Sequence, residues 1–110
     1  DRRSLVGYTG KVPSLHDVIR TLREQEPSLR ARGVVRAAVF GSVVRGEATN
    51  ESDIDVLVDL DPSRRLSVFG LIAIKHHLDD VFGRPVDVVS RRGLKASVRP
   101  SVERELVDAF

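Results

Sequence analysis

Cysteine, methionine and tryptophan are all absent from this chain of 110 residues. Without cysteine it has no disulfide, no thiolate nucleophile and no thiolate zinc site. Aromatic side chains are scarce as well, with four phenylalanines and one tyrosine, and the net charge is only +2. Nucleic-acid-binding surfaces usually combine a basic stripe with aromatic residues. Direct nucleic-acid binding is therefore not favoured.

Long hydrophobic runs are also missing. The longest, around residues 68–74, is far shorter than a membrane span and contains a glycine. No secretory signal pattern opens the sequence, so we expect a cytoplasmic protein that contacts no membrane. The hydrophobic content of 41% and the charged content of 31% are typical of a globular protein. We expect an irregular segment over residues 1–13 and a single domain over residues 14–110.

Hydrophobic periodicity predicts that helices and strands alternate along the chain. A 3.6-residue period predicts helices over these residues: 15–25, with a further turn to 32, then 67–82 and 102–109. A short helix is expected near residues 42–45. Apolar, β-branched runs predict strands over these residues: 34–40, 54–60 and 86–89. The expected fold is α/β, a small mixed sheet of three strands or slightly more, with helices packed on it in the order α-β-α-β-α-β-α.

The stretch over residues 35–60 concentrates the chemistry. Gly41 and Ser42 end the first predicted strand, and Asp53 and Asp55 open the second. Successive strand side chains alternate between faces, so the two carboxylates point the same way. Neighbouring carboxylates repel unless a cation lies between them, and Mg²⁺ is usually held by one or two carboxylates together with substrate phosphates. Backbone N–H groups at a glycine turn can bind phosphate, so the combination indicates nucleotide chemistry.

A Gly-Ser pair, ten residues and then Asp-x-Asp, placed between two apolar strands, resembles the signature of the polymerase-beta-type nucleotidyltransferase superfamily. Three segments resemble its smallest members, the minimal nucleotidyltransferase (MNT) antitoxins found beside HEPN-domain toxins: GSVVRGEATNESDIDVLVDL, LSVFGLIAIKHHLDDVFGRPVDVVSRRGLK and VERELVDAF. The resemblance spans residues 14–110. It implies a nucleotidyltransferase-type fold, one or two Mg²⁺ ions, ATP as substrate and a HEPN-type toxin encoded nearby as partner.

Three acids are the candidate catalytic and metal-binding residues. Asp53 and Asp55 would hold Mg²⁺, which orients the triphosphate and neutralises the leaving pyrophosphate. In the resembled family a third strand supplies another ligand, often also the base for the incoming hydroxyl, and Asp87 matches it. Asp59 and Asp61 share the strand parity of this pair. Asp59 lies about 13 Å from Asp55 along the strand, too far for the same ion, so we interpret both as solvated.

The Gly-Ser turn is the candidate nucleotide-binding element. Gly41 is expected to contact the β and γ phosphates through its backbone, and Ser42 through its hydroxyl. Arg45 lies one helical turn after Ser42 and is a further candidate for the phosphate site. Many relatives carry a basic residue directly after the Gly-Ser pair, where this chain has Val43. The expected pocket is therefore less positive than in those relatives.

The leading hypothesis is an antitoxin that transfers AMP from ATP to a hydroxyl, by resemblance a tyrosine hydroxyl, of a HEPN-type toxin. The arginines Arg64, Arg91 and Arg92 are expected to be exposed and to contact a protein acceptor. Two alternatives remain: nucleotidylation of a small hydroxyl compound such as an aminoglycoside, and a non-catalytic antitoxin that blocks its partner by binding. Histidine metal binding is not favoured, because His76 and His77 are adjacent on a helix and cannot face one ion.

Overall fold

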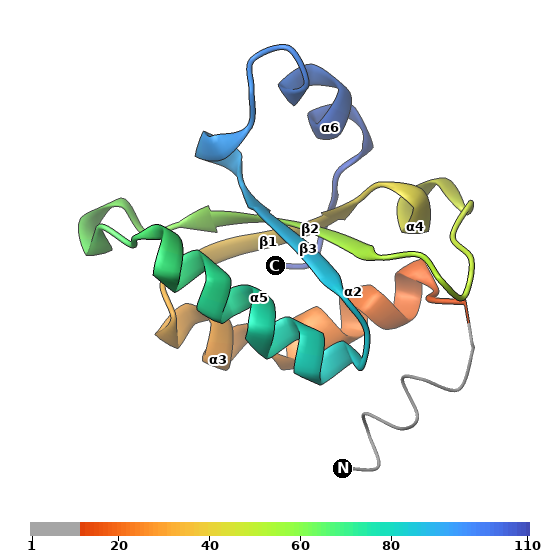
Figure 1. Ribbon diagram of the computed structural model, residues 1–110, viewed down its shortest axis with the longest axis horizontal. Coiled ribbons are helices and arrows are strands. Elements are labelled where there is room, and N and C mark those ends of the chain that lie inside the picture. The colour runs from red at the N-terminus through yellow and green to blue at the C-terminus, as the bar shows by residue number, and fades with distance from the viewer. Residues whose placement is uncertain (1–11) are drawn as a thin grey trace.

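The computed structural model describes residues 12–110, and its centre is a four-stranded sheet in the order β3-β2-β1-β4 (Figure 1). The strands are β1 (Val34–Phe40), β2 (Ile54–Leu60), β3 (Val86–Ser90) and β4 (Val107–Asp108). β1 is antiparallel to β2 and β4, whereas β2 and β3 are parallel. The mixed sheet with packed helices confirms the predicted fold class. The predicted irregular segment over residues 1–13 lies almost wholly outside the described residues.

Helices lie on both sides of this sheet (Figure 1). Three of them cover one face: α2 (Leu15–Glu24), α3 (Glu26–Ala31) and α5 (Val68–Phe82). On the other side lie α6 (Arg99–Glu105) and, where β1 leads into the next loop, the single turn α4 (Ser42–Arg45). Two 3₁₀ turns follow β2 and β3: η1 (Pro62–Arg64) and η2 (Arg91–Gly93). Among the described residues, no helix is both long enough and apolar enough to cross a membrane.

β2 is buried on both faces. Val56 and Val58 are fully buried toward the three covering helices, where they join Leu22 and Leu78 in the core. Leu57, which alternation places on the opposite face with Asp55, is only 1% exposed. Two-sided burial explains why β2 reads as an almost continuous apolar run rather than a polar-apolar alternation.

Local sequence signals set the helix boundaries. The Ser14 hydroxyl accepts a hydrogen bond of 3.1 Å from the backbone N–H of Asp17 and caps α2. The predicted extra turn is α3, a separate helix with Pro27 in its first turn. Gly83 takes the left-handed conformation, with φ +67°, and ends α5. These caps leave only short connections into the strands that carry the predicted site.

The predicted helix over residues 102–109 is wrong at its C-terminal end. Helix α6 stops at Glu105, and Leu106 is extended, with φ −63° and ψ 135°. Val107 and Asp108 then pair with the edge of β1. The apolar spacing of this segment fits a helix, but a short run cannot distinguish a helix from a strand by periodicity alone. The unpaired edge of β1 decides the outcome, because it offers backbone partners that the sequence pattern does not show.

Candidate active site

The predicted metal-binding carboxylates lie where two neighbouring parallel strands begin. Asp55 in β2 is in register with Asp87 in β3, and Asp53 comes one residue before β2. In-register residues of neighbouring strands project to the same face of a sheet. Asp55 is half-buried, whereas Asp53 and Asp87 are exposed. The structure therefore gathers the three acids around one end of the β2–β3 pair.

The electrostatics of this cluster centre on Asp55. Partial burial raises the pKa of the Asp55 carboxyl above its ordinary value, and the negative charges of Asp87 and Asp53 raise it further. The positive charge of Arg45 opposes that shift. The folded chain therefore holds negative charge at Asp55 at a cost, and a bound cation would remove this cost.

The donor chemistry of the cluster fits Mg²⁺, because all three side chains offer carboxylate oxygens. As they stand, however, no three His, Cys, Asp or Glu side chains within residues 12–110 are arranged to hold a metal ion. The exposed side chains of Asp53 and Asp87 would have to turn toward Asp55. Their exposure permits such a rotation without disturbing the core. The three-ligand set therefore stays a prediction that the fold allows.

Gly41 brings the predicted phosphate turn directly against Asp55. Its backbone, with φ +81° and ψ −153°, lies in a region that essentially only glycine occupies. A Cβ atom at this position would lie 2.9 Å from the carboxyl carbon of Asp55 and would overlap its Oδ2. The glycine is therefore required twice, once for the backbone conformation and once for the close approach to a carboxylate.

The residues after Gly41 form the single turn α4. Ser42 begins it and is partly exposed, whereas Val43 is only 5% exposed and packs in the core. A basic side chain at position 43 would have to be buried, which explains the apolar residue there. Arg45 ends the turn and is half-exposed. Its Nε donates to Glu47 at 2.9 Å, and its Nη1 donates to Glu105 at 3.1 Å.

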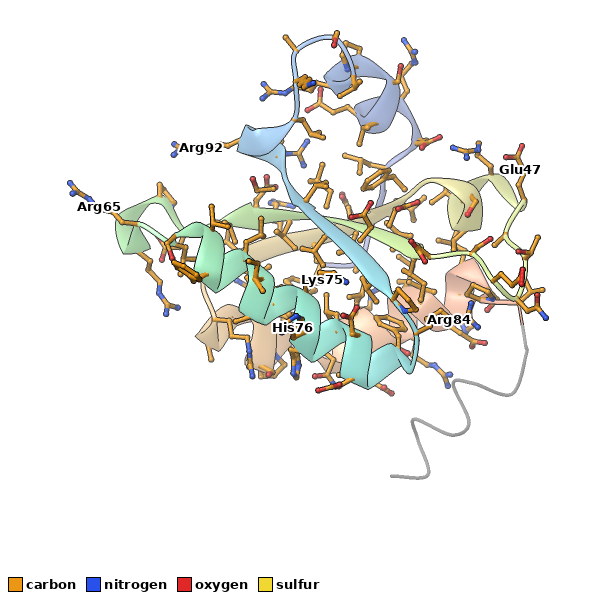
Figure 2. All side chains as sticks on the ribbon, viewed as in Figure 1. Glu47, Arg65, Lys75, His76, Arg84 and Arg92 are labelled. Carbon is orange, nitrogen blue, oxygen red and sulfur yellow. The ribbon has the colours of Figure 1, made fainter. Side chains whose placement is uncertain are left out.

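Glu105 is a site residue that sequence reasoning missed. Its Oε1 accepts a hydrogen bond of 2.9 Å from the backbone N–H of Gly41, 64 positions earlier in the chain. The two acids on Arg45 raise the pKa of its guanidinium, mainly through their hydrogen bonds. Figure 2 shows Glu47 just beyond α4 at the outer edge of the molecule. No local pattern marks Glu105, because the contact depends on how α6 packs over the sheet.

Residues 18–110 match the family model described as a nucleotidyltransferase domain. The chain belongs to this nucleotidyltransferase family. It is 38% identical over 95 residues to the protein adenylyltransferase MntA of Thermococcus cleftensis, which covers 86% of this chain and 94% of that protein. A solved structure of a minimal nucleotidyltransferase shares 39% identity and a TM-score of 0.72, covering 89% of this chain and 98% of that one. These findings confirm the predicted family.

A toxin–antitoxin structure with AMP-PNP has the same fold. It matches with a TM-score of 0.68 at 20% identity and covers 80% of this chain and 72% of that one. At this identity the match concerns the backbone architecture alone. It confirms the nucleotidyltransferase-type fold predicted from the Gly-Ser and Asp-x-Asp pattern.

Partly buried polar contacts hold the two strand starts of this nucleotidyltransferase in place. Buried Arg84 donates from Nη1 to the Ser52 carbonyl oxygen at 3.2 Å, which fixes the approach to β2. The Asp79 carboxylate accepts from the Val86 N–H at 2.7 Å and pairs with Lys75 Nζ at 3.0 Å, which fixes the start of β3. Figure 2 shows Lys75 and Arg84 beside α5 and the loop that follows it. These contacts hold the chain where it enters β2 and β3, beside the acid cluster.

The interpretation of Asp59 as solvated is wrong. Its carboxylate accepts two hydrogen bonds from Arg91, at 2.8 and 3.2 Å, and its side chain is 23% exposed. Arg91 also donates to Glu103 at 2.9 Å. The prediction that Arg91 is an exposed arginine is therefore wrong, because two acids engage its side chain. The physical reason is the two-sided burial of β2: Asp59 shares the face on which Leu57 is buried, opposite the three covering helices, and an acid there needs a cationic partner. Asp61 is also engaged: it accepts from the Ser63 hydroxyl at 2.8 Å and from the Ser63 N–H at 2.9 Å, and these hydrogen bonds lower the Asp61 pKa.

A hollow of about 300 Å³ lies at the far end of β2 and β3, away from the acid cluster. Its charged lining residues are Asp59, Asp61, Arg65, Arg91 and Arg92. Arg65 and Arg92 project at this end of the molecule (Figure 2). Of the arginines expected to contact an acceptor, Arg64 donates to the Ala31 carbonyl oxygen at 3.0 Å and Arg92 is exposed. All of these arginines lie at the opposite strand ends from the candidate catalytic acids.

Proposed function

We propose that this nucleotidyltransferase is an antitoxin that transfers AMP from ATP to a hydroxyl group of a partner toxin. The observation that carries the proposal is the contact between the Gly41 backbone and Asp55, with Asp53 and Asp87 beside it. This contact sets a candidate phosphate turn against candidate cation ligands. The relative from Thermococcus cleftensis, with 38% identity, is a protein adenylyltransferase, which favours a protein as the acceptor.

The residues then have separable roles. Asp53 and Asp55 would hold Mg²⁺, which supplies positive charge that stabilises the leaving pyrophosphate. Gly41 and Ser42 bind the β and γ phosphates through a backbone N–H and a hydroxyl, and Arg45 adds its guanidinium to the phosphate site. Asp87 takes the proton of the acceptor hydroxyl, whose oxygen bonds to the α-phosphorus while the bond to the bridging oxygen breaks. Pyrophosphate leaves, and AMP stays on the acceptor.

For the partner we propose a HEPN-type toxin encoded nearby, modified on a tyrosine. Two solved structures that share this fold are toxin–antitoxin complexes, one of them with AMP-PNP. A cytoplasmic location goes with this proposal, because both ATP and such a toxin would be met there. The other interpretations are a non-catalytic antitoxin that blocks its partner by binding, and an enzyme that modifies a small hydroxyl compound.

One experiment separates these functions. The purified protein is incubated with labelled ATP, Mg²⁺ and the product of the neighbouring gene, and the neighbour is examined for the mass of one or more AMP groups. We expect transfer by the wild type and by the Glu51→Gln control, which changes an exposed acid of the preceding loop, and none by Asp55→Asn. A stable complex without label would favour the binding antitoxin, and label only on an added aminoglycoside would favour the small-molecule enzyme.

A further inference from the structure

The donors that the proposed function assigns to nucleotide phosphates are already engaged by a side chain of the same protein. Glu105 Oε1 accepts from the Gly41 N–H at 2.9 Å, and both carboxylate oxygens lie within 3.2 Å of Arg45 Nη1. The Glu105 side chain is 25% exposed, compared with 64% for Glu47. Glu105 is therefore seated in the site rather than resting on its rim.

The engaged donors leave little for a second anion. Gly41 has one backbone N–H, and the hydrogen bond of 2.9 Å to Glu105 uses it. Arg45 donates from Nη1 to Glu105 and from Nε to Glu47, so two of its three nitrogens face carboxylates. Carboxylate and phosphate oxygens are the same kind of acceptor for these groups. A phosphate can contact Gly41 only where the Glu105 oxygen now lies.

We propose that Glu105 is an internal competitor for the phosphate-binding donors, which ATP must displace, and that it thereby sets the affinity of the site for nucleotide. The proposal rests on the proposed function, because it takes Gly41 and Arg45 as phosphate contacts. Displacement also has an electrostatic consequence. Glu105 is one of the negative charges near Asp55, so its departure reduces the negative charge around the acids just as the triphosphate brings more.

The test measures binding of inorganic tripolyphosphate in EDTA and of ATP with Mg²⁺ by titration calorimetry. Glu105→Gln keeps the size of the side chain and an acceptor for the Gly41 N–H but removes the charge, whereas Glu105→Ala removes the competitor altogether. We expect Glu105→Ala to bind tripolyphosphate about ten- to a hundredfold more tightly than the wild type, because the competing hydrogen bonds to Gly41 and Arg45 are gone. Glu105→Gln should gain by a smaller factor, because a neutral amide oxygen still accepts from Gly41 but holds both donors more weakly than a carboxylate. In AMP transfer the KM for ATP should fall with kcat unchanged, because only ground-state competition is relieved.

Glu47→Gln is the matched control. It removes a carboxylate that also pairs with Arg45 but does not touch Gly41, so tripolyphosphate affinity should stay within about twofold of wild type. Thermal melts of every variant show whether an effect comes from lost folding. The Gln variant keeps the Gly41 contact and loses only the charge. Its tripolyphosphate affinity therefore tests the competition even where the Ala variant is unstable.

The outcomes also separate this proposal from the proposed function. Unchanged or weaker tripolyphosphate binding in Glu105→Gln overturns the competition, even where the wild type transfers AMP. Tighter binding in a protein that transfers no AMP to its neighbour supports the competition and removes the transferase function. An equal gain in tripolyphosphate affinity in Glu47→Gln would also overturn the proposal. The gain would then come from removing any negative charge near Arg45 and not from freeing the Gly41 N–H.

Discussion

Asp55 and Asp87 stand opposite each other across the parallel strands β2 and β3. In-register acids on adjacent strands repel, and partial burial of Asp55 adds a desolvation cost. The fold accepts this cost at the end of the sheet where the phosphate turn lies. Such locally unfavourable charge is typical of sites selected for binding rather than stability.

Asp55→Asn should raise stability and abolish transfer. Asp55 ionises less readily in the folded than in the unfolded chain, so its charge at neutral pH lowers the free energy of unfolding. Removing the charge should add at most about 1 kcal/mol after solvent screening, measured by urea unfolding in EDTA. AMP transfer should fall at least about a hundredfold, because a cation ligand is lost. A less stable Asn variant would show that repulsion does not dominate at this position.

Gly41→Ala should be more damaging than Gly46→Ala. Both glycines have positive φ, but the first lies in the glycine-only region against Asp55, whereas a Cβ at Gly46 would meet no atom within 4 Å. We expect a loss of at least about 2 kcal/mol for Gly41→Ala and about 1 kcal/mol for Gly46→Ala, from denaturant unfolding. Equal losses would mean that the contact with Asp55 relaxes at no cost.

The pair Asp59–Arg91 should contribute to stability and not to transfer. Two hydrogen bonds join these side chains on the face of β2 opposite the three covering helices. A double-mutant cycle with Asp59→Ala and Arg91→Ala should give a coupling energy of about 1 kcal/mol in the free energy of unfolding. At temperatures well below unfolding, AMP transfer by both single variants should stay close to wild type. A hundredfold loss of transfer would place Arg91 in the active site after all.

His77 should make the fold sensitive to mild acid. Its Nε2 lies 2.9 Å from Gln25 Oε1, and partial burial, helped by the charge of Arg32, lowers its pKa below the ordinary 6.5, against the opposing charge of Asp80. The unfolded chain therefore takes up the proton first. The stability contributed by neutral His77 is complete above pH 6.5 and is lost as the pH falls through the lower folded pKa.

The measurement is urea unfolding from about pH 5 to about pH 8, the range in which histidine titrates. His77→Gln should flatten the decline below pH 6.5 that the wild type shows. His76→Gln is the control, because the neighbouring histidine is exposed on α5 (Figure 2). A variant at position 76 that flattens the curve as much as one at 77 would contradict the assignment.

Local sequence patterns predict the helices, the strands and the candidate acids. They do not predict side-chain contacts between segments far apart in the chain. The strands 34–40 and 54–60 were predicted at their observed bounds, because glycine and polar residues bracket each apolar run. Asp53, Asp55 and the Gly41 turn are candidates because of their spacing in the sequence. Glu105 and the partner of Asp59 come from segments 64 and 32 positions away, where no period or motif reaches. The prediction for the segment that forms β4 is wrong for the same reason, since only pairing with the edge of β1 defines this strand.

The backbone on either side of Glu105 is tied down. Before it, Arg99 donates to the Arg91 carbonyl oxygen at 3.2 Å, and after it the Ala109 N–H bonds to the Ala37 carbonyl oxygen at 2.8 Å. Release of the carboxylate therefore calls for rotation about its own side-chain bonds and not for movement of α6. Such rotations are complete within nanoseconds at accessible positions. Rapid-mixing traces of nucleotide uptake should accordingly follow a single concentration-dependent exponential, without the slow phase that a moving helix would add.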